Sequence, residues 1–283
     1  MKEIWIIQTG EPMPSDTGQR PMRASNLART LQKNGLKVKI ITSRFFHQKK
    51  IHRVSSHNHN IEADIEEIYI DSPGYKENLS ISRLLDHAVL AINLKKYLKT
   101  QSEKPDIIFV GYPPIEFSYV AIQWAFKNKI PSIIDIKDQW PNLFYQNRPM
   151  IIKDIMKLIF FPYEYMAKKL IRRSTSITAP TESYINWALK KSNMARRNND
   201  KSFPLVSGDS KIIKSYNDNI RQINKLKKYF NILFVGSHMS VFDFKHVAHA
   251  AEILETRKDI RFIICGDGNY FQSNKSLFKN LDN

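Results

Sequence analysis

Short apolar runs alternate with longer segments of helical periodicity along the first 190 residues. The apolar runs cover residues 3–9, 38–42, 66–70, 106–110, 130–136 and 174–179. Between several of them lie segments in which apolar residues recur every three or four positions, at 24–31, 80–98 and 117–124. Strands that alternate with helices in this way predict an α/β fold, with a doubly wound parallel sheet covered by helices.

Two carboxylates mark the end of one of these runs. Residues 130–136 are mostly β-branched and apolar, which predicts a strand buried on both faces, and Asp135 and Asp138 stand at its carboxyl end. Ligands of open α/β sheets bind outside the carboxyl ends of the strands, so the pair predicts acidic groups at a substrate site. The alternative is that Asp138 caps the next turn and Trp140 packs beneath it, because aspartate is common at turns.

The first strand, loop and helix contain a candidate phosphate site. A polar loop over residues 10–21 leads to the helix at 24–31, and Gly35 is placed to end that helix in a left-handed conformation. The loop lacks the G-x-G-x-x-G fingerprint of dinucleotide-binding proteins. Gly18 and Arg20 nevertheless stand just ahead of the helix N-terminus, where backbone N–H groups favour phosphate.

The sequence predicts two domains and a basic connection. Residues 1–190 are expected to form the first domain, residues 191–228 a basic linker or surface crossing, and residues 229–283 the start of a second α/β domain. The last part contains a strand-like run, a helical segment and a second strand-like run. Only 54 residues follow Tyr229, whereas such a domain needs about 100 or more, so it is expected to be incomplete and the chain truncated.

The formal net charge of +17 favours an anionic partner, such as a membrane surface, a phosphorylated substrate or nucleic acid. The chain has no zinc-finger spacing and no RNA-binding aromatic signature, so nucleic acid is not expected. It has no stretch of eighteen apolar residues that would predict a transmembrane helix. Its single cysteine, Cys265, cannot form an internal disulfide, which fits a reducing cytoplasm.

Residues 149–173 combine bulky apolar side chains with six Lys or Arg and two Asp or Glu, for a net charge of +4. Pro162 predicts a break or a kink in the helix here. One interpretation is a segment that lies on an anionic bilayer, with its apolar side chains inserted and its bases over the headgroups. The other is a helix that packs on the sheet and has a basic outer face. The sequence favours neither interpretation.

A series of short motifs extends over nearly the whole chain. The motifs are Gly10-Glu11-Pro12-x-Pro14, Arg20-Pro21-Met22-Arg23, Ser43-x-Phe45-x-His47-x-x-Lys50-x-x-Arg53, Ile81-Ser82-Arg83-Leu84-x-Asp86-His87, Asp135-x-x-Asp138-x-Trp140-Pro141, Glu182-Ser183-Tyr184-x-x-Trp187-Ala188, Phe234-Val235-Gly236-Ser237 and Gly266-Asp267-Gly268. In their order and spacing the chain resembles the GT-B glycosyltransferases of family 4. Within that family it is most similar to the branch that makes bacterial O-antigen, capsule or exopolysaccharide.

The resemblance implies two Rossmann-like domains that face a cleft. The N-terminal, doubly wound domain would receive the acceptor, often a lipid-linked saccharide, and the C-terminal domain, incomplete here, would bind a nucleotide-sugar donor. Transfer in this family retains the anomeric configuration and usually needs no metal, and no cofactor is expected. The protein is expected to be cytoplasmic and peripheral on the inner face of the cytoplasmic membrane.

The resemblance also implies roles for single residues. Asp138 would be the catalytic carboxylate that orients the acceptor hydroxyl, with Asp135 supporting it. The residues expected to bind the acceptor are Gln139, Trp140, His47 and His87. The residues expected to lie near the donor diphosphate are Gly18, Arg20, Arg23, Gly236 and Ser237.

Two other functions share parts of this pattern. Nucleotide-sugar epimerases have the same two-domain architecture, and a non-catalytic module could use the basic surface to hold a membrane or nucleic acid. Members of the resembled family carry a later Glu-rich donor motif, which would lie beyond Asn283. The chain alone is therefore expected to be inactive or nearly so.

Overall fold

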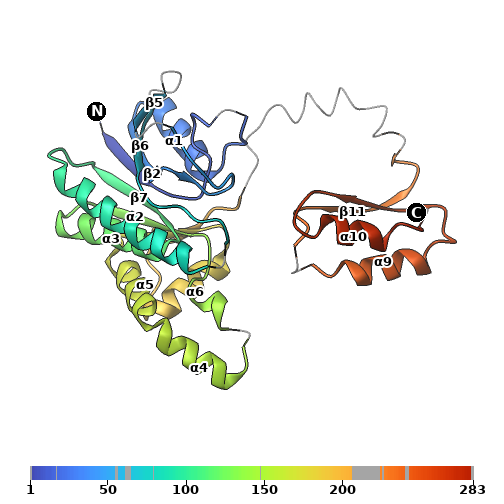
Figure 1. Ribbon diagram of the computed structural model, residues 1–283. Coiled ribbons are helices and arrows are strands. Elements are labelled where there is room, and N and C mark those ends of the chain that lie inside the picture. Colours follow the sequence, from blue (N-terminus) through green and yellow to red (C-terminus); the bar gives the residue numbers. More distant parts are fainter. Residues whose placement is uncertain are drawn as a thin grey trace. The chain divides into compact units, whose positions relative to one another are not determined.

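A computed structural model describes residues 2–16, 18–54, 57–60, 65–78, 80–146, 148–205, 224, 226–239 and 242–281. The chain forms two compact units, Met1–Ser207 and Gly208–Asn283 (Figure 1). Each unit is described by itself. Within the described ranges, no helix combines the length and the apolar character that crossing a bilayer would require.

A single large sheet organises the first unit. Its strands are β1 Glu3–Ile7, β2 Lys37–Ser43, β5 His57–Asn60, β6 Ile65–Ile70, β7 Ile107–Tyr112, β8 Ser132–Ile136, β9 Ser176–Ala179 and β10 Lys201–Ser202. They lie in the order β10-β9-β8-β7-β1-β2-β6-β5. All neighbouring strands are parallel except β5 and β6, which run antiparallel. The predicted doubly wound parallel sheet is confirmed, and β5 is an antiparallel strand added at its edge.

Helices cover both faces of this sheet (Figure 1). They are α1 Arg23–Lys33, α2 Ile81–Thr100, α3 Ile115–Lys127, α4 Met150–Ile159, α5 Phe161–Arg173 and α6 Glu182–Ser192. Alternate residues of a strand point to opposite faces, so Trp5 and Ile7 face the core built with α2, α3, α5 and α6, whereas Ile6 faces the core built with α1. A short hairpin, β3 Phe45–Phe46 with β4 Ile51–His52, follows β2.

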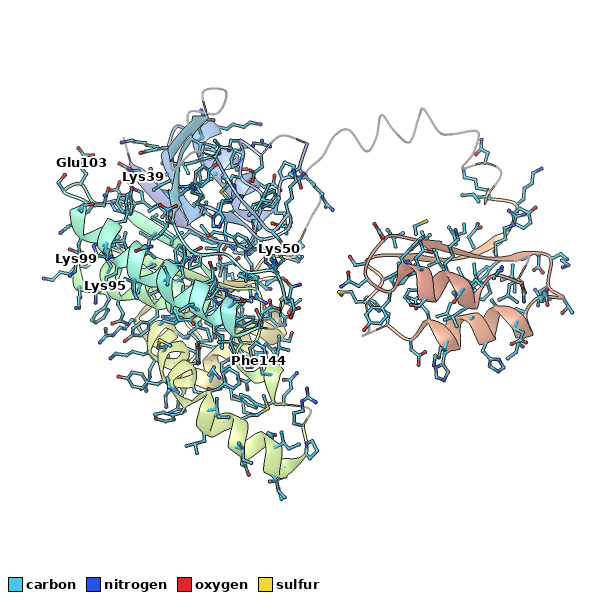
Figure 2. The ribbon with its side chains drawn as sticks, in the orientation of Figure 1. Lys39, Lys50, Lys95, Lys99, Glu103 and Phe144 are labelled. Carbon is cyan, nitrogen blue, oxygen red and sulfur yellow. The ribbon has the colours of Figure 1, made fainter. Side chains whose placement is uncertain are left out.

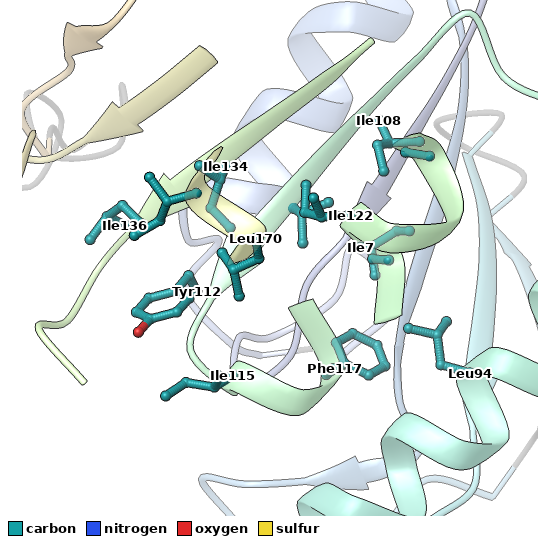
Figure 3. Close-up of a cluster of buried hydrophobic side chains, with 14 of the residues drawn as sticks. Ile7, Leu94, Ile108, Tyr112, Ile115, Phe117, Ile122, Ile134, Ile136 and Leu170 are labelled. Atoms are coloured by element: carbon teal, nitrogen blue, oxygen red, sulfur yellow. The ribbon is translucent and has the colours of Figure 1, made fainter. Parts of the chain in front are cut away.

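The larger core lies under α2, α3 and α5 (Figure 3). It joins Ile108 and Ile134 of neighbouring strands to Phe117 of α3, Leu94 of α2 and Leu170 of α5, and none of these five side chains is exposed. Full burial of one such side chain contributes about 1.5–3 kcal/mol to the free energy of folding. This core holds the carboxyl ends of the strands rigidly in place.

Glycine and proline set two helix ends as predicted. Gly35 has φ +76° just after α1, a left-handed conformation that costs glycine little. Helix α4 ends at Ile159, and α5 begins at Phe161 with Pro162 in its first turn. Proline suits a first turn because its missing N–H would have no helical partner there. The predicted break at Pro162 is therefore confirmed.

The first unit extends beyond the expected boundary at residue 190. Residues 191–205 belong to it, because β10 pairs with β9 and because Asp200, which is buried, accepts hydrogen bonds from Ile177 N (2.8 Å) and Arg197 N (2.8 Å). The expected boundary at residue 190 is therefore corrected: residues 191 and 192 end α6, and residues 201 and 202 form the edge strand β10 of the first unit. Residues 206–223 lie outside the described residues.

The second unit contains the predicted strand, helix and strand. β11 Phe230–Val235 and β12 Ile260–Cys265 are parallel neighbours, and α9 Phe244–Ile253 connects them. A further helix, α10 Phe271–Leu277, was not expected because its sequence is short and polar. Contacts between α9 and α10 fix its place in the unit.

Candidate functional site

A pocket of about 220 Å³ lies at the carboxyl ends of the strands in the first unit. Strand β1 lies between β2 and β7, so the chain leaves β1 toward one side of the sheet and returns on its other side. Such a switch point is where open α/β sheets bind their ligands. Four strands contribute wall residues directly at or after their ends: Gln8, Thr9, Ser43, Pro113, Pro114, Lys137 and Asp138.

The side chain of Asp138 forms part of the pocket wall, two residues after β8 ends. Burial raises the pKa of Asp138 above its usual range, and the charges of Arg83 and Lys137 oppose that shift. A half-buried carboxylate with a raised pKa is suited to accept a proton from a bound hydroxyl. The structure thus places the predicted catalytic carboxylate where a ligand can reach it.

Asp135 does not line the pocket. Its side chain is fully buried and lies on the face of β8 that α1 covers. Arg23 Nη2 donates a hydrogen bond to Asp135 Oδ1 (2.9 Å), and Arg23 Nε lies 2.9 Å from Oδ2. Thr178 Oγ1 also donates to Oδ1 (2.7 Å). The pair ties the N-terminus of α1 to the centre of the sheet. In this structure Asp135 supports the site by fixing the N-terminus of α1 through Arg23. Its predicted catalytic role stays a prediction.

Sequence reasoning assigned no role to Glu11, which connects the pocket wall to α1. Its side chain is buried, and its carboxylate accepts hydrogen bonds from Ala24 N (2.8 Å) and from Lys137 Nζ. A carboxylate at a helix N-terminus is stabilised by the helix dipole. Glu11 stands well ahead of α1 in the sequence, so no helical spacing could have identified it.

Two histidines line the pocket, as expected for His47 and His87. His47 Nδ1 lies 2.6 Å from the Tyr75 hydroxyl, and His87 Nδ1 lies 4.0 Å from Glu116 Oε2. Burial lowers the pKa of His47 to about 4 and that of His87 to about 3, with further lowering by the Arg83 charge. Neutral imidazoles offer one donor and one acceptor each, which matches sugar hydroxyls better than a cation would.

Between pH 7 and pH 5, we expect the free energy of unfolding to fall less for His87→Gln than for the unaltered protein. The unfolded His87 takes up a proton near pH 6.5, whereas the folded one stays neutral down to about 3. The unfolded state therefore binds more protons in this interval, and stability is lost as the pH falls. Denaturant unfolding at both pH values measures the difference. A His87 ring whose NMR signals titrate near pH 6.5 would contradict the assignment.

Gln139 and Trp140 follow Asp138 but do not line the pocket. The Trp140 ring lies behind the wall, 4.9 Å from the Arg83 guanidinium, 6.0 Å from the His87 ring and 4.9 Å from the Phe144 ring. Trp140 therefore positions two wall residues. Direct contact of either predicted residue with an acceptor stays a prediction.

The predicted phosphate residues of the loop at 10–21 lie outside this pocket, although Gly10 and Glu11 of the same loop line it. Gly18 and Arg20 are exposed, and Gly18 has φ +73°. Arg23 is held by Asp135 and by the carbonyl of Phe203, to which its Nη1 donates (2.7 Å). None of these three residues lines the pocket, and their donor roles stay predictions.

Gly236 and Ser237 directly follow β11 in the second unit. Gly236 N donates to Cys265 O (3.0 Å), and His238 N donates to Asp267 O (2.9 Å), so the loops after β11 and β12 lie together. A Cβ at position 266 would come 1.8 Å from Gly236 O, so only glycine allows this approach. In the described part of the chain, no group of three or more His, Cys, Asp or Glu could hold a metal ion.

No protein-family model matches the sequence, and no curated protein is significantly similar to it. Solved structures do resemble it. Acinetobacter baumannii MurG has a TM-score of 0.51 at 13% identity, over 99% of this chain and 65% of that protein. Anabaena HepE in complex with UDP has a TM-score of 0.53 at 12% identity, over 99% and 66%. A UDP-forming trehalose-phosphate synthase from Burkholderia vietnamiensis has a TM-score of 0.55 at 10% identity, over 100% and 68%.

These structural neighbours are GT-B glycosyltransferases. The chain spans about two thirds of their length. At such low sequence identity the likeness concerns the fold alone. The chain therefore has the α/β, Rossmann-like fold that is found in the GT-B glycosyltransferases.

Proposed function

We propose that the protein is a retaining glycosyltransferase that moves a sugar from a nucleotide-sugar donor to a lipid-linked saccharide acceptor. The observation that supports this most is the placement of Asp138 in a pocket at the switch point of the sheet. The shared fold adds support, since one neighbour of the same fold was solved with UDP. We further propose membership of family 4 and a role in the synthesis of O-antigen, capsule or exopolysaccharide.

In this proposal the pocket receives the acceptor. Asp138 accepts a hydrogen bond from the acceptor hydroxyl, orients it toward the anomeric carbon of the donor sugar and takes up its proton. The new bond joins the acceptor oxygen to that carbon on the face from which the nucleoside diphosphate departs, so the configuration is retained, and the diphosphate leaves with the electrons of the broken bond. Neutral His47 and His87 bind neighbouring hydroxyls. At the end of β11, Gly236 lets the donor diphosphate approach the backbone, and the N–H of Ser237 binds it.

The proposal concerns the gene product at its natural length, because this chain spans about two thirds of the neighbours' length. The test is incubation of that product with labelled nucleotide sugars and bacterial membranes. Label in the lipid fraction supports transfer. Release of an altered sugar without a lipid product indicates an epimerase, and absence of both reactions rejects an enzyme of either kind.

We place this reaction at the inner face of the cytoplasmic membrane, and helix α4 supports that choice. In Figure 1 α4 extends away from the sheet of the first unit, and none of its residues is buried. Its isoleucine and leucine residues follow the spacing of one helical face, and all five are exposed: Ile151, Ile152, Ile155, Leu158 and Ile159. Lys153 and Lys157 lie on the opposite, polar side. An apolar face flanked by lysines is typical of helices that lie on an anionic bilayer.

Replacing Ile151 and Leu158 together by aspartate should lower binding to anionic vesicles by at least tenfold. These side chains are 76% and 78% exposed, so the bilayer is where they can be buried, and each buried side chain contributes about 1.5–3 kcal/mol. Stability in solution should change by less than about 0.5 kcal/mol per site. Sedimentation with phosphatidylglycerol-containing vesicles measures the binding.

Ile92→Asp is the matched control, because Ile92 on α2 is also exposed (54%) but lies outside α4. It should leave vesicle binding unchanged. Vesicle binding that survives both aspartates in α4 would show that this helix does not dock on the bilayer. A concentration-dependent dimer that the aspartates abolish would assign the apolar face to a second copy of the chain instead.

A further inference from the structure

The basic side chains of Lys50 and Arg83 lie beside the pocket, and both contact Tyr75 and Asn78. Lys50 Nζ lies 4.4 Å from the centre of the Tyr75 ring, and the Arg83 guanidinium lies 5.5 Å from it. Lys50 Nζ donates to Asn78 Oδ1 (2.6 Å), and Arg83 Nη1 donates to Asn78 O (2.7 Å). Tyr75 and Arg83 line the pocket, and Lys50 contacts its wall through His47 Nδ1 (3.1 Å).

Asp138 and Glu116 lie close enough for the Arg83 charge to act on the pKa of each carboxyl, but neither is close enough to form an ion pair with Arg83. Within the described residues, neither Lys50 nor Arg83 forms an ion pair, whereas Lys137 across the pocket pairs with Glu11. Burial lowers the pKa of Lys50, and the neighbouring positive charge of Arg83 lowers it further. Arg83 Nε is also buried without a hydrogen-bond acceptor.

The start of α2 adds to this positive region. Ser80 caps the 20-residue helix by accepting a hydrogen bond from Arg83 N (3.2 Å), which places the positive end of the helix dipole at the same position. Two cations that converge at a helix N-terminus, neither with an ion-pair partner among the described residues, favour an anion between them. A guanidinium and an ammonium together suit an oxyanion, because one offers a planar fork and the other a point charge.

We propose that the acceptor carries an anionic group, a phosphate or a carboxylate, which Lys50 and Arg83 bind together beside the pocket. That the bound molecule is a sugar acceptor rests on the proposed function. The anion site itself does not depend on sugar transfer. The neutral imidazoles of His47 and His87 then take the saccharide hydroxyls, while the cation pair fixes the charged end of the same molecule. A phosphate would belong to a lipid carrier, and a carboxylate would belong to an acidic sugar.

Two lysines of α2, the helix that carries Arg83, have a different explanation. Lys95 and Lys99 lie toward the opposite end of the helix from Lys50 (Figure 2). Both are exposed, and basic residues near a helix C-terminus are stabilised by the helix dipole without any ligand. Lys95 and Lys99 provide a matched control, because each carries the same charge as Arg83 and lies on the same helix.

The test measures binding of inorganic pyrophosphate, glucuronate and glucose to the full chain by isothermal titration, without any donor. We expect pyrophosphate or glucuronate to bind, and Lys50→Gln and Arg83→Gln each to weaken binding at least tenfold. Lys95→Gln with Lys99→Gln should change it less than twofold. Preference for pyrophosphate assigns a phosphate-linked carrier, and preference for glucuronate assigns an acidic sugar.

Equal losses in the control variant, or no binding of either anion, would overturn the inference. Because Lys50 is a partly exposed loop residue, Lys50→Gln should leave the thermal midpoint unchanged, which keeps the test valid if Arg83→Gln unfolds the chain. Anion binding that depends on Lys50 in a protein without transferase activity would reject the proposed function and keep the anion site.

Discussion

Asp138→Asn should lower sugar transfer by about 10²- to 10⁴-fold, the range expected when a group that accepts a proton in the transition state is lost. The amide can still accept a hydrogen bond but has no basic oxygen for the hydroxyl proton. Burial raises the pKa of the Asp138 carboxyl above its usual range, which suits a side chain that takes up a proton in this step. Transfer of label from nucleotide sugars to membrane lipid, measured with the gene product at natural length, gives the ratio.

Asp71→Asn is the control for the loss of one negative charge. Asp71 is an exposed partner of Arg44 (3.0 Å) and lies outside the pocket. We expect it to keep full activity. Asp138→Glu should retain part of the activity, since the base is kept but displaced. Equal activity of Asp138→Asn and the unaltered enzyme would remove Asp138 from the chemistry and leave it the turn-capping role that the sequence also allowed.

Arg23→Met should lower the free energy of unfolding of the first unit by about 3–5 kcal/mol, because it leaves the fully buried Asp135 carboxylate without its cation. The hydrogen bond from Thr178 persists but cannot neutralise the charge. All four tryptophans lie in the first unit, so their fluorescence reports its unfolding alone. Urea titration of the full chain therefore measures this difference.

Lys37→Met is the matched control, since Lys37 and Glu3 form an exposed pair at 3.3 Å. Exposed pairs contribute about 0–1 kcal/mol, so the loss should be small. The double variant Arg23→Met with Asp135→Asn should recover part of the stability, because the orphaned charge is gone. If Arg23→Met unfolds at the same urea concentration as the unaltered chain, the pair does not anchor α1 to the sheet.

The strands could be predicted because their signal is local. Runs such as Ile130–Ile136 are apolar on both faces, and a buried parallel strand requires that composition. The position of Asp138 followed from the same reasoning, since a residue just past a parallel strand must lie at the sheet edge where ligands bind. Period-two alternation also puts Asp135 on the face of Ile133, away from Ile134.

The partners of these residues could not be predicted. Arg23 reaches Asp135 across 112 positions in the sequence, and Lys137 reaches Glu11 across 126. Only the packed fold brings such pairs together, and no periodic pattern encodes them. The same holds for Lys50 and Arg83, which belong to separate sequence motifs. Both contact Tyr75, a residue of the loop after β6. The segment 149–173 divides between its two interpretations: α5 packs on the core through Ala167, Leu170 and Ile171, whereas no residue of α4 is buried, and bilayer binding by α4 stays a proposal.

The most direct test of the central claim is to incubate the gene product at natural length with labelled UDP-sugars and membrane lipids, and then separate the lipid fraction. We expect label in a lipid-linked saccharide with the anomeric configuration of the donor, and we expect that label to be lost in Asp138→Asn. A labelled lipid product that forms equally well with Asp138→Asn, or an altered nucleotide sugar with no lipid product, would contradict it.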